Sequence, residues 1–449
     1  MLFIGMKVFS KKKYFKEKIL FLVDHKHRDL ISNCLISYYL KKKGYEVYLR
    51  RLHENEVGLI RPDVVIENKL GRNPKYLKRI KSWKNQNIKI ILIENEGINQ
   101  WDIEEKKVSF YPDLSFFWNK NHTHKLDKSY EQKVLGSPRS DLLHKKFSSI
   151  FKSRKELENL YKINPDLKNI TVAFHNSYED LDKKKLHEMS KTRLHIYKEH
   201  FSFFHMVEHQ KIARKKLIKF IENLLEKSQK FNLILKPHPN DNIKFWYKFK
   251  EKYPSVTLMY GAPINDLFCL SDLHVGKSGC STIPESYIYG LPNIELNFDD
   301  KLSMSILSKD HVNLGLQNTS DFKNLNYSLT DILEKKISSE IIKNYEKKMQ
   351  NYINEHFHLI DGNRCKEYAN YIDNFLNKNK KSKNVSKLVS GYHITLNFLS
   401  DFFVKYIKKL LGKYYKYHLI DKRGRYDSRI QLNDEKKYYT LFDKINLLD

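Results

Sequence analysis

The stretch that decides the fold is residues 266–296, DLFCLSDLHVGKSGCSTIPESYIYGLPNIEL. It runs from an apolar segment through a turn of small residues to a helix opened by Ser281 and Thr282, and then to a short strand after Gly290. Small residues let the backbone approach a ligand closely, and the N-terminus of the following helix presents unpaired N–H groups to an anion. The stretch therefore predicts an anion-binding turn at a strand end of an α/β sheet.

A second turn, KPHP at residues 236–239, follows the apolar segment 232–236. Its two prolines stiffen the turn and fix where His238 points. A positioned imidazole can donate to a phosphate oxygen or protonate a leaving group, although a surface turn whose histidine bonds the backbone fits the triplet as well. Two such turns, with Lys236 beside the second, predict a pocket for a phosphate or diphosphate.

The composition favours a folded protein of two domains plus an extension, because 449 residues and 53.9 kDa exceed one ordinary core. The four cysteines form no CxxC pair, which argues against a zinc site or a disulfide framework and fits a reducing compartment. No run approaches the ~20 apolar residues of a membrane span. Apolar residues precede the first lysines, the reverse of a secretory signal. We therefore expect a cytoplasmic protein.

The formal net charge of +29 is spread along the whole chain, mostly as lysine. Diffuse charge of this kind is more typical of a solvated surface than of a nucleic-acid groove. The sequence has no zinc finger, RNP-type aromatic motif or helix-turn-helix pattern, so we expect no nucleic-acid partner. An anionic membrane surface or an acidic glycan fits this charge better.

Residues 1–144 alternate short apolar runs with amphipathic stretches. This β-α-β-α rhythm implies a parallel sheet covered on both faces. The expected strands are 18–24, 46–51, 63–67, 88–94 and 114–118, with helices at 29–43 and near 76–83 and a last strand with its exit loop at 133–141.

A charged, helix-prone connector at 145–168 leads to a second alternating set at 169–376. Two Rossmann-like halves in tandem place ligand turns at strand C-terminal ends and predict a cleft between the domains. The expected strands are 169–175, 232–236, 256–260, 272–276 and 292–296, with helices at 207–227, 264–270 and 282–289 and a helical stretch at about 338–375 that leans back across the cleft.

Residues 377–449 form a basic extension of different character. Within it, residues 388–411 mix aromatic residues, leucine and isoleucine with lysines, and the apolar positions recur at helical spacing. Such a helix lies in a membrane interface or packs on the protein's own surface, and the pattern fits both. We expect the extension to hold the protein on the inner face of the cytoplasmic membrane.

The hydroxyl-rich turn supports two interpretations. In the functional one, Ser278, Gly279, Ser281 and Thr282 hold a phosphate through hydroxyls and backbone N–H groups, and Glu285 reaches ribose hydroxyls. However, residues 282–285 also match a capping box, in which Glu285 bonds the N-terminus of its own helix. Capping and phosphate binding share one geometry, so the two interpretations are partly compatible for the serine and the threonine.

Acidic residues follow the expected strand at 88–94, in the segment ILIENEG at 91–97. Glu94 and Glu96, followed by Gly97, are expected at the carboxyl edge of the first sheet. A carboxylate there can act as general base for an acceptor hydroxyl, and Glu96 is our choice for this role. The alternative is a pair of solvated acids at the start of a loop.

Two further basic segments are candidates for the same region. His25 and Arg28 belong to DHKHRD at residues 24–29 and can bind acceptor or phosphate. Metal binding by His25 and His27 lacks a convincing set of partners, so no metal is expected. Arg139, in GSPR at 136–139, supplies either a guanidinium to the cleft or a structural contact between domains.

On these residues the chain resembles a GT-B glycosyltransferase, and most of all the bacterial surface-carbohydrate (capsule and lipopolysaccharide) biosynthesis proteins. The resemblance covers about residues 18–370 and rests on LKPHPND, the stretch around 265–296, IENEG, GSPRSDLL and DGNRCKEYANYI. It implies two Rossmann-like domains facing a cleft, with a basic helical extension at the C-terminus.

The trio of an acidic turn, an HP turn and a hydroxyl turn is also similar to the bacterial sialyl- and Kdo-type transferases, which use CMP-sugars. That resemblance implies Glu96 as base, His238 on the CMP phosphate, and Ser281 with Thr282 completing the phosphate site. Asn95 departs from the pattern, which has a second carboxylate there.

The implied activity is transfer of a sugar from a nucleotide-activated, CMP-linked donor to a glycan or lipid-linked acceptor, without a metal or other cofactor. A CDP-polyol phosphotransferase, which shares a similar HP turn and serine-rich turn, is one alternative. A non-catalytic nucleotide- or glycan-binding protein is the other.

Overall fold

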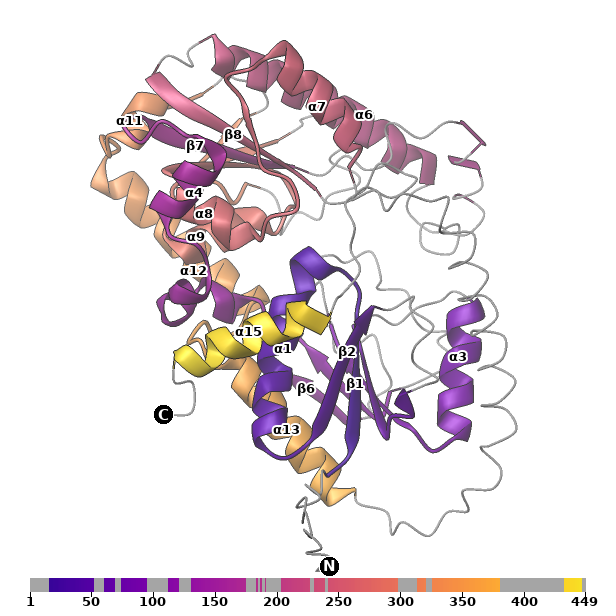
Figure 1. Cartoon of the computed structure of the whole chain (residues 1–449). Helices are drawn as coiled ribbons and strands as arrows, with labels where there is room; N and C mark the ends of the chain where they lie inside the picture. Colours follow the sequence, from indigo (N-terminus) through magenta and orange to yellow (C-terminus); the bar gives the residue numbers. More distant parts are fainter. Residues whose placement is uncertain are drawn as a thin grey trace, which may run out of the picture.

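The computed structural model describes residues 16–51, 60–68, 74–94, 112–120, 131–174, 203–226, 230–238, 241–297, 313–319, 325–379 and 432–445, and residues 183, 184, 186, 187 and 190. Within this part of the chain lie two α/β domains, one above the other in Figure 1. Each contains one six-stranded sheet in which every pairing is parallel. The predicted fold of two Rossmann-like domains is confirmed.

The sheet of the first domain has the order β2-β1-β3-β4-β5-β6. Its strands are β1 (Lys18–Val23), β2 (Glu46–Arg51), β3 (Val64–Glu67), β4 (Lys89–Ile93), β5 (Leu114–Phe117) and β6 (Glu131–Val134). Phe21 and Val23 pack toward α1 (Lys26–Lys42), whereas Leu20 and Leu22 pack toward α3 (Pro74–Asn85). Both faces are therefore covered, which is why these strands read as continuous apolar runs.

The sheet of the second domain has the order β12-β11-β10-β7-β8-β9. Its strands are β7 (Lys168–Phe174), β8 (Phe231–Pro237), β9 (Thr257–Leu258), β10 (Leu273–Lys277), β11 (Asn293–Leu296) and β12 (Gln317–Thr319). The helices of this domain are α6 (Phe203–Leu225), α7 (Ile243–Lys252), α8 (Ile264–Leu270), α9 (Thr282–Tyr289), α11 (Leu329–Leu333) and α12 (Ser339–His356). The strand order reverses between β7 and β10, which is where doubly wound sheets bind ligands.

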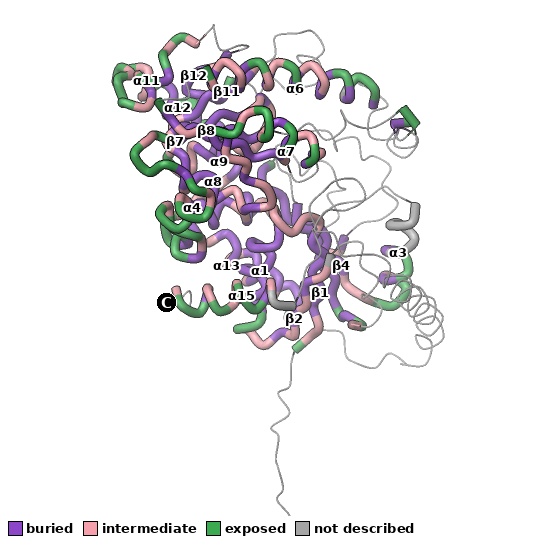
Figure 2. The backbone as a smooth tube through the Cα atoms, turned by 45° about the horizontal axis from the view of Figure 1, so that its top comes forward, coloured by how far each residue is buried: buried purple, intermediate pink, exposed green. Residues whose placement is uncertain are grey.

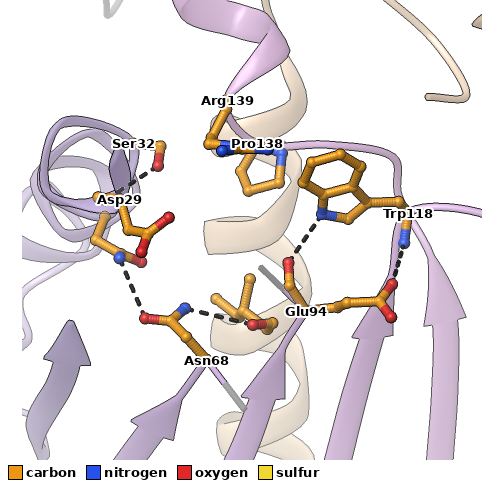
Figure 3. Close-up of a pocket in the computed structure, with 9 residues that line it drawn as sticks. Asp29, Ser32, Asn68, Glu94, Trp118, Pro138 and Arg139 are labelled. Carbon is orange, nitrogen blue, oxygen red and sulfur yellow. Dashed lines mark hydrogen bonds between the residues drawn. The ribbon is translucent and has the colours of Figure 1, made fainter. Parts of the chain in front are cut away.

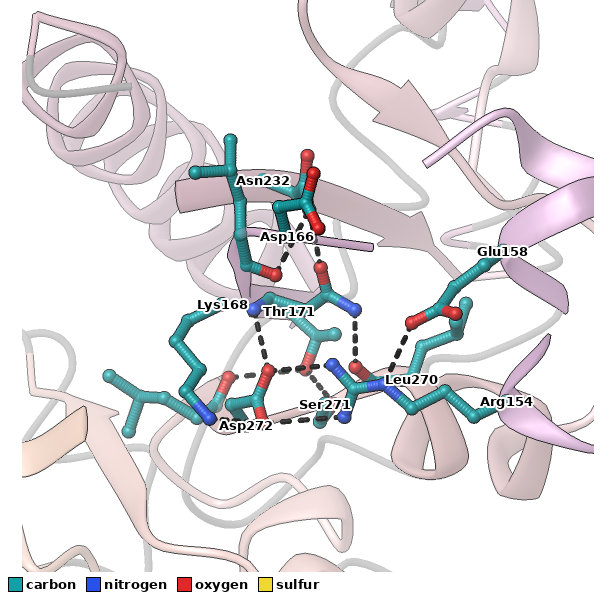
Figure 4. Close-up of polar contacts among 12 residues, drawn as sticks. Arg154, Glu158, Asp166, Lys168, Thr171, Asn232, Leu270, Ser271 and Asp272 are labelled. Atoms are coloured by element: carbon teal, nitrogen blue, oxygen red, sulfur yellow. Dashed lines mark hydrogen bonds and ion pairs between the residues drawn. The ribbon is translucent and has the colours of Figure 1, made fainter. Parts of the chain in front are cut away.

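The connector between the domains consists of η3 (Ser140–Leu143), η4 (Lys145–Ile150) and α4 (Arg154–Tyr161). Figure 4 shows how α4 is fixed to the second sheet. Arg154 Nη2 donates to Asp272 Oδ2 at 2.8 Å, and the backbone N–H of Asn169 donates to the same oxygen at 2.8 Å. Burial acts to raise the pKa of Asp272, but these hydrogen bonds outweigh it and hold the pKa below its usual range.

Two helices from the end of the chain pack back on the first domain. These are α13 (Arg364–Lys378) and α15 (Leu432–Lys444), and both contact α1. Covered by the sheet on one side and by these helices on the other, α1 is buried along most of its length (Figure 2). Such burial explains why its apolar residues are not confined to one stripe, and Asp29, Ser32, Asn33 and Ser37 are buried with them.

The segment after β6 anchors α13. Gly136 has φ 82°, and a Cβ there would lie 2.4 Å from the backbone oxygen of Phe357. Asp141 accepts hydrogen bonds from the backbone N–H groups of Arg364 at 2.9 Å and Cys365 at 2.7 Å. A carboxylate from the first domain therefore caps the first turn of α13 and interacts favourably with its dipole.

The start of α1 differs from the prediction. Residues 24–29 were expected to form a loop, but α1 begins at Lys26. The Nδ1 atom of His25 accepts from the backbone N–H of His27 at 3.2 Å, and Asp29 Oδ2 accepts from the N–H of His25 at 3.1 Å. These two bonds cap the helix three residues earlier than the apolar periodicity indicates.

Other elements were not predicted at all, namely α7, β12, α11 and α15. The helical stretch expected at 338–375 is two helices, α12 and α13, separated by residues 357–363. Of the extension at 377–449, residues 377–379 and 432–445 are described, and α15 lies on the protein itself. The expected amphipathic helix at 388–411 lies outside the described residues. No helix in the described ranges is long and apolar enough to cross a membrane.

Candidate functional site

Residues that follow strands of the first sheet meet residues that follow strands of the second. The ring of His25, after β1, has its centroid 6.5 Å from that of His238, after β8. Arg139, after β6, places Nη2 3.4 Å from Glu285 Oε1 in α9, the helix after β10. The carboxyl edges of the two sheets therefore face each other, and we call the residues between them the interdomain site.

The small-residue turn after β10 is a tight one. The backbone N–H of Cys280 donates to Lys277 O at 3.0 Å, and Gly279 between them has φ 73°, a conformation that favours glycine. A Cβ at Gly276 would lie 2.7 Å from Ile283 Cδ1, so the missing side chain lets α9 pack directly on β10. The turn and the start of α9 are thus held together at the strand end, as the sequence predicts.

The predicted capping box at residues 282–285 is wrong. The N-cap is Ser281, whose φ of −60° and ψ of −17° are helical, and no side chain caps the helix there. An N-cap hydroxyl reaches the N–H groups of the first turn from an extended backbone, which Ser281 does not adopt. Thr282 instead lies within the helix and contacts Cys280 Sγ at 3.3 Å.

Glu285 accepts a hydrogen bond from Ser281 at the terminus of its own helix and also reaches the first domain. Its side chain is only 7% exposed and forms the ion pair with Arg139. Burial raises the pKa of Glu285, while Arg139, a hydrogen bond from Ser281 and the charge of Arg28 oppose the rise. The two arginines from the first domain and a carboxylate from the second thus form one charged group across the interdomain site.

Arg139 lies beside a small pocket at the edge of the first sheet (Figure 3). Its guanidinium carbon is 5.0 Å from the centre of a Trp118 ring. Two buried polar atoms of this loop, Ser137 Oγ and Arg139 Nε, have no hydrogen-bond partner. The pocket is lined by Asp29, Ser32, Asn33, Asn68, Ile93, Glu94, Trp118, Pro138 and Arg139.

Glu94, at the end of β4, lies in this pocket. Its Oε2 atom accepts from the backbone N–H of Trp118 at 3.2 Å, and its backbone oxygen accepts from the indole Nε1 at 2.8 Å (Figure 3). The carboxylate is therefore held in place and largely buried rather than solvated at a loop start. Glu96 and Gly97, the predicted base and its neighbour, lie outside the described residues.

Arg28 projects from the first turn of α1. It donates to Asp24 Oδ2 at 2.9 Å and to Asp29 Oδ1 at 2.9 Å. Its charge also acts on Glu285, so the start of α1 belongs electrostatically to the interdomain site.

Two predicted donor-binding residues make internal contacts. The hydroxyl of Ser278 donates to Glu295 Oε1 at 2.6 Å and to the backbone oxygen of Leu296 at 3.1 Å, which links the turn to β11. Lys236 is 7% exposed, and burial lowers its pKa to about 8 against the opposing charge of Asp266. Ser278 therefore connects the turn to β11, and the Lys236 side chain is enclosed by the protein.

Most residues of the pocket were not singled out from the sequence, among them Asn68, Trp118 and Asp29, and neither was Ser137 beside it. The amide of Asn68 donates to the backbone oxygen of Ile93 at 3.3 Å and accepts from Asn33 at 3.4 Å. Asn68 and Trp118 each follow a strand directly, and position at a carboxyl strand end is the signal that could have found them. In the described ranges no group of three or more His, Cys, Asp or Glu side chains could hold a metal ion.

Solved structures of other proteins share this architecture. Two parallel six-stranded domains with facing carboxyl edges form a GT-B, Rossmann-like fold. No family model and no curated protein matches the sequence. A variant of the wall teichoic acid polymerase TagF matches with a TM-score of 0.52 and 14% identity, over 81% of this chain and 89% of that chain.

Two other solved structures match at similar identity. A TagF variant soaked with CDPG gives a TM-score of 0.51 and 13% identity, over 81% of this chain and 90% of that chain. A structure of S. aureus MnaA with UDP gives 0.47 and 14%, over 83% of this chain and all of that chain (100%). At such identities the likeness to TagF shows the fold.

Proposed function

We propose that this chain is a nucleotide-sugar-dependent transferase of the GT-B type that acts in the synthesis of surface glycans. The observation that carries the proposal is the meeting of His25 with His238 and of Arg139 with Glu285 between the two sheet edges. Ligands of open α/β sheets bind outside the carboxyl ends of the strands. A donor bound there touches both domains at once.

The second domain supplies the groups suited to a phosphate. The turn of residues 277–280 and the uncapped start of α9 offer backbone N–H groups, and His238 offers an imidazole from the end of β8, which β7 separates from β10 in the sheet. In the proposed reaction these groups stabilise the charge that builds on the leaving phosphate, an electrostatic contribution that is usually the largest in such transfers. Ser281, Thr282 and Glu285 hold the donor, with Glu285 exchanging Arg139 for ribose hydroxyls.

The first domain supplies the groups suited to an acceptor. Ser137 Oγ and Arg139 Nε are buried without partners, and leaving such a donor unpaired costs about 1–3 kcal/mol. A bound hydroxyl or anion would satisfy both. In this proposal Glu96 removes the proton of the acceptor hydroxyl, Glu94 orients the acceptor from the pocket, and no metal takes part.

The finer assignments also belong to the proposal. The donor is a CMP-linked sugar, and the acceptor is a glycan or a lipid-linked glycan at the inner face of the cytoplasmic membrane. The HP turn, the hydroxyl turn and the basic charge of the chain support these choices. No nucleic-acid partner is proposed.

A second candidate is a CDP-polyol phosphotransferase. It is favoured by the likeness to the wall teichoic acid polymerase TagF, one structure of which was soaked with CDPG. Both candidates use the same phosphate-binding turns. They differ in whether the donor's phosphate leaves with the nucleotide or is transferred to the acceptor.

The test is nucleotide release from a panel of CMP-, CDP- and UDP-linked donors, with His238→Ala as the variant. We expect turnover with one donor class and a loss of about 10²-fold or more in the variant, since a positioned general acid contributes roughly that much. His187→Ala, which removes an exposed imidazole that the proposed site does not use, is the matched control and should retain activity.

Near-wild-type turnover of His238→Ala would contradict the assigned role. Nucleotide binding without turnover on any acceptor would instead support a non-catalytic binding protein. Release of CMP from a CDP-linked donor, with its phosphate found on the acceptor, would favour the phosphotransferase.

A further inference from the structure

Positive charge is distributed unevenly over the helices. The sequence of α3 holds five basic residues and no acidic one, and α6 with α7 holds nine basic and three acidic residues. In contrast, α4, α12, α13 and α15 are each balanced to within one charge, and α1, which holds four basic residues and one acidic residue, is buried along most of its length. A compositional bias toward lysine would enrich all helices alike, so the partition needs a local reason.

The basic helices also lie on one side of the molecule. In the first domain α3 covers the sheet face opposite to α1, α13 and α15. In the second domain α6 and α7 cover the face that carries Val172 and Leu233, whereas α4 and α8 cover the face that carries Ala173 and Ile234. Figures 1 and 2 both show α3 and the free end of α6 on the side away from α4, α12 and α15.

The two helices α6 and α7 run parallel and present one continuous face. The Arg214 guanidinium on α6 lies 3.5 Å from the ring of Phe245 on α7. Eight residues further along in each segment, Tyr253, the residue directly after α7, donates to Glu222 on α6 at 2.6 Å. By this register the first two turns of α6, residues 203–210, extend beyond the start of α7. Since α7 follows the turn that carries His238, this overhang lies at the carboxyl edge of the sheet.

The outer face of α6 and α7 combines exposed aromatic rings with lysines. Phe204 is 48% exposed and Tyr247 is 50% exposed, two of the few large apolar side chains exposed in the described ranges. Four exposed lysines of the two helices have no ion-pair partner there: Lys215, Lys219, Lys244 and Lys248. We call these six residues the α6–α7 face.

We propose that the α6–α7 face docks on an anionic membrane surface, with α3 of the other domain on the same side of the molecule. Basic residues near such a surface are attracted by its negative potential, and aromatic rings at the same level are favoured at the lipid headgroups. The overhang would then bring the interdomain site close to the lipid. The proposal does not depend on catalysis, nor on the C-terminal extension.

The experiment is co-sedimentation of the full-length protein with vesicles of phosphatidylcholine containing 30% phosphatidylglycerol, at about 0.1 M salt. Lys215→Glu/Lys219→Glu should lower vesicle affinity at least about tenfold, because two charges are reversed on the docking face. Phe204→Ser should lower it several-fold. Binding of the wild type should weaken at about 0.5 M salt, where surface charges are screened.

Matched controls come from α12 and α4, which lie away from the free end of α6 in Figures 1 and 2. Lys343→Glu/Lys347→Glu on α12 reverses the same number of charges at the same spacing, and Leu160→Ser on α4 removes an equally exposed apolar side chain (57%). Both should bind as the wild type does. Equal losses in the controls, unchanged binding of the α6 variant, or equal binding to neutral vesicles would overturn the proposal, as would tighter binding of single-stranded RNA at the same salt.

Discussion

Single residues at the interdomain site are held in states that burial alone would disfavour. Glu285 is nearly inaccessible to solvent, and its charge is balanced by Arg139 from the other domain. Lys236 is as deeply buried as Glu285. Burial lowers its pKa, and the charge of Asp266 opposes this fall. Buried ionisable groups cost stability, and their concentration at one place is typical of a functional site.

Lys236 allows a direct test through pH. Burial lowers its pKa to about 8, below the ordinary 10.5, so the folded protein binds fewer protons than the unfolded chain between these values. Its burial penalty, about 3 kcal/mol, is therefore complete below pH 8 and is relieved as pH rises toward 10.5. Lys236→Met should be more stable than the wild type at pH 7 by up to this amount, reduced by the favourable charge interaction that Asp266 loses in the variant.

Urea denaturation of both proteins from pH 7 to pH 10.5 measures this difference. The advantage of Lys236→Met should shrink as pH rises through 8. If Lys236 helps to hold the donor's phosphate, the same variant binds nucleotide more weakly despite its greater stability. A stability difference that is constant with pH would contradict the assigned protonation behaviour.

At the scale of elements, the segment after β6 connects the first domain to α13, a helix that follows the second domain in the chain. Gly136 makes room for the backbone at Phe357, and Asp141 caps α13. The return helix α13 in turn buries α1, whose first turn carries His25 and Arg28. The position of these two residues thus depends on a contact more than two hundred residues away in sequence.

Replacing Gly136 should disturb this contact specifically. Gly136→Ala forces a Cβ to within 2.4 Å of a backbone oxygen at φ 82°, so both strain and overpacking act. We expect a loss of about 3 kcal/mol or more in the free energy of unfolding. Gly44→Ala is the matched control, because Gly44 has φ 95° but no atom within 4 Å of its would-be Cβ.

Chemical denaturation with urea compares the two variants. Gly44→Ala should lose only about 1 kcal/mol, the cost of the left-handed conformation alone. Equal losses in both variants would show that the backbone conformation, and not the approach of Phe357, sets the requirement for glycine at 136.

Much of the element pattern could be predicted because it is local. The strands β1, β2, β8 and β10 and the helices α8 and α9 follow directly from apolar runs and their periodicity. The capping box failed because the backbone of Ser281 is helical, and Glu285 in addition meets Arg139, a partner in another domain. The helix α7 was missed although its buried residues Ile243, Trp246 and Phe249 recur at helical spacing, because further aromatic residues stand between them in the sequence.

At the scale of the whole molecule, two parallel domains present their carboxyl edges to each other. The tandem α/β alternation predicted both sheets, and of the residues expected at the cleft the structure brings together His25 with His238 and Arg139 with Glu285. The pocket residues Asn68 and Trp118 were not found, since their position directly after a strand is their only signal and their residue types belong to no catalytic motif. The packing of α13 and α15 on the first domain likewise depends on partners that are distant in sequence.

The position of the proposed membrane face determines from which side an acceptor in the membrane would reach the interdomain site. The basic helices lie on the side of the molecule where α6 overhangs the carboxyl edge of its sheet, and the near-neutral helices lie away from it. A lipid-linked acceptor would approach the interdomain site from this side. The vesicle experiment and the donor panel test these two statements separately.

The central claim is that a nucleotide binds between the two sheet edges, and a crystal structure with CMP, CDP or UDP soaked in tests it most directly. The account predicts density for a nucleotide whose phosphate lies between His238 and the turn of residues 277–280, with the Arg139–Glu285 ion pair replaced by a contact to the ribose. A nucleotide bound elsewhere, or no nucleotide at millimolar concentration with that ion pair intact, would contradict it.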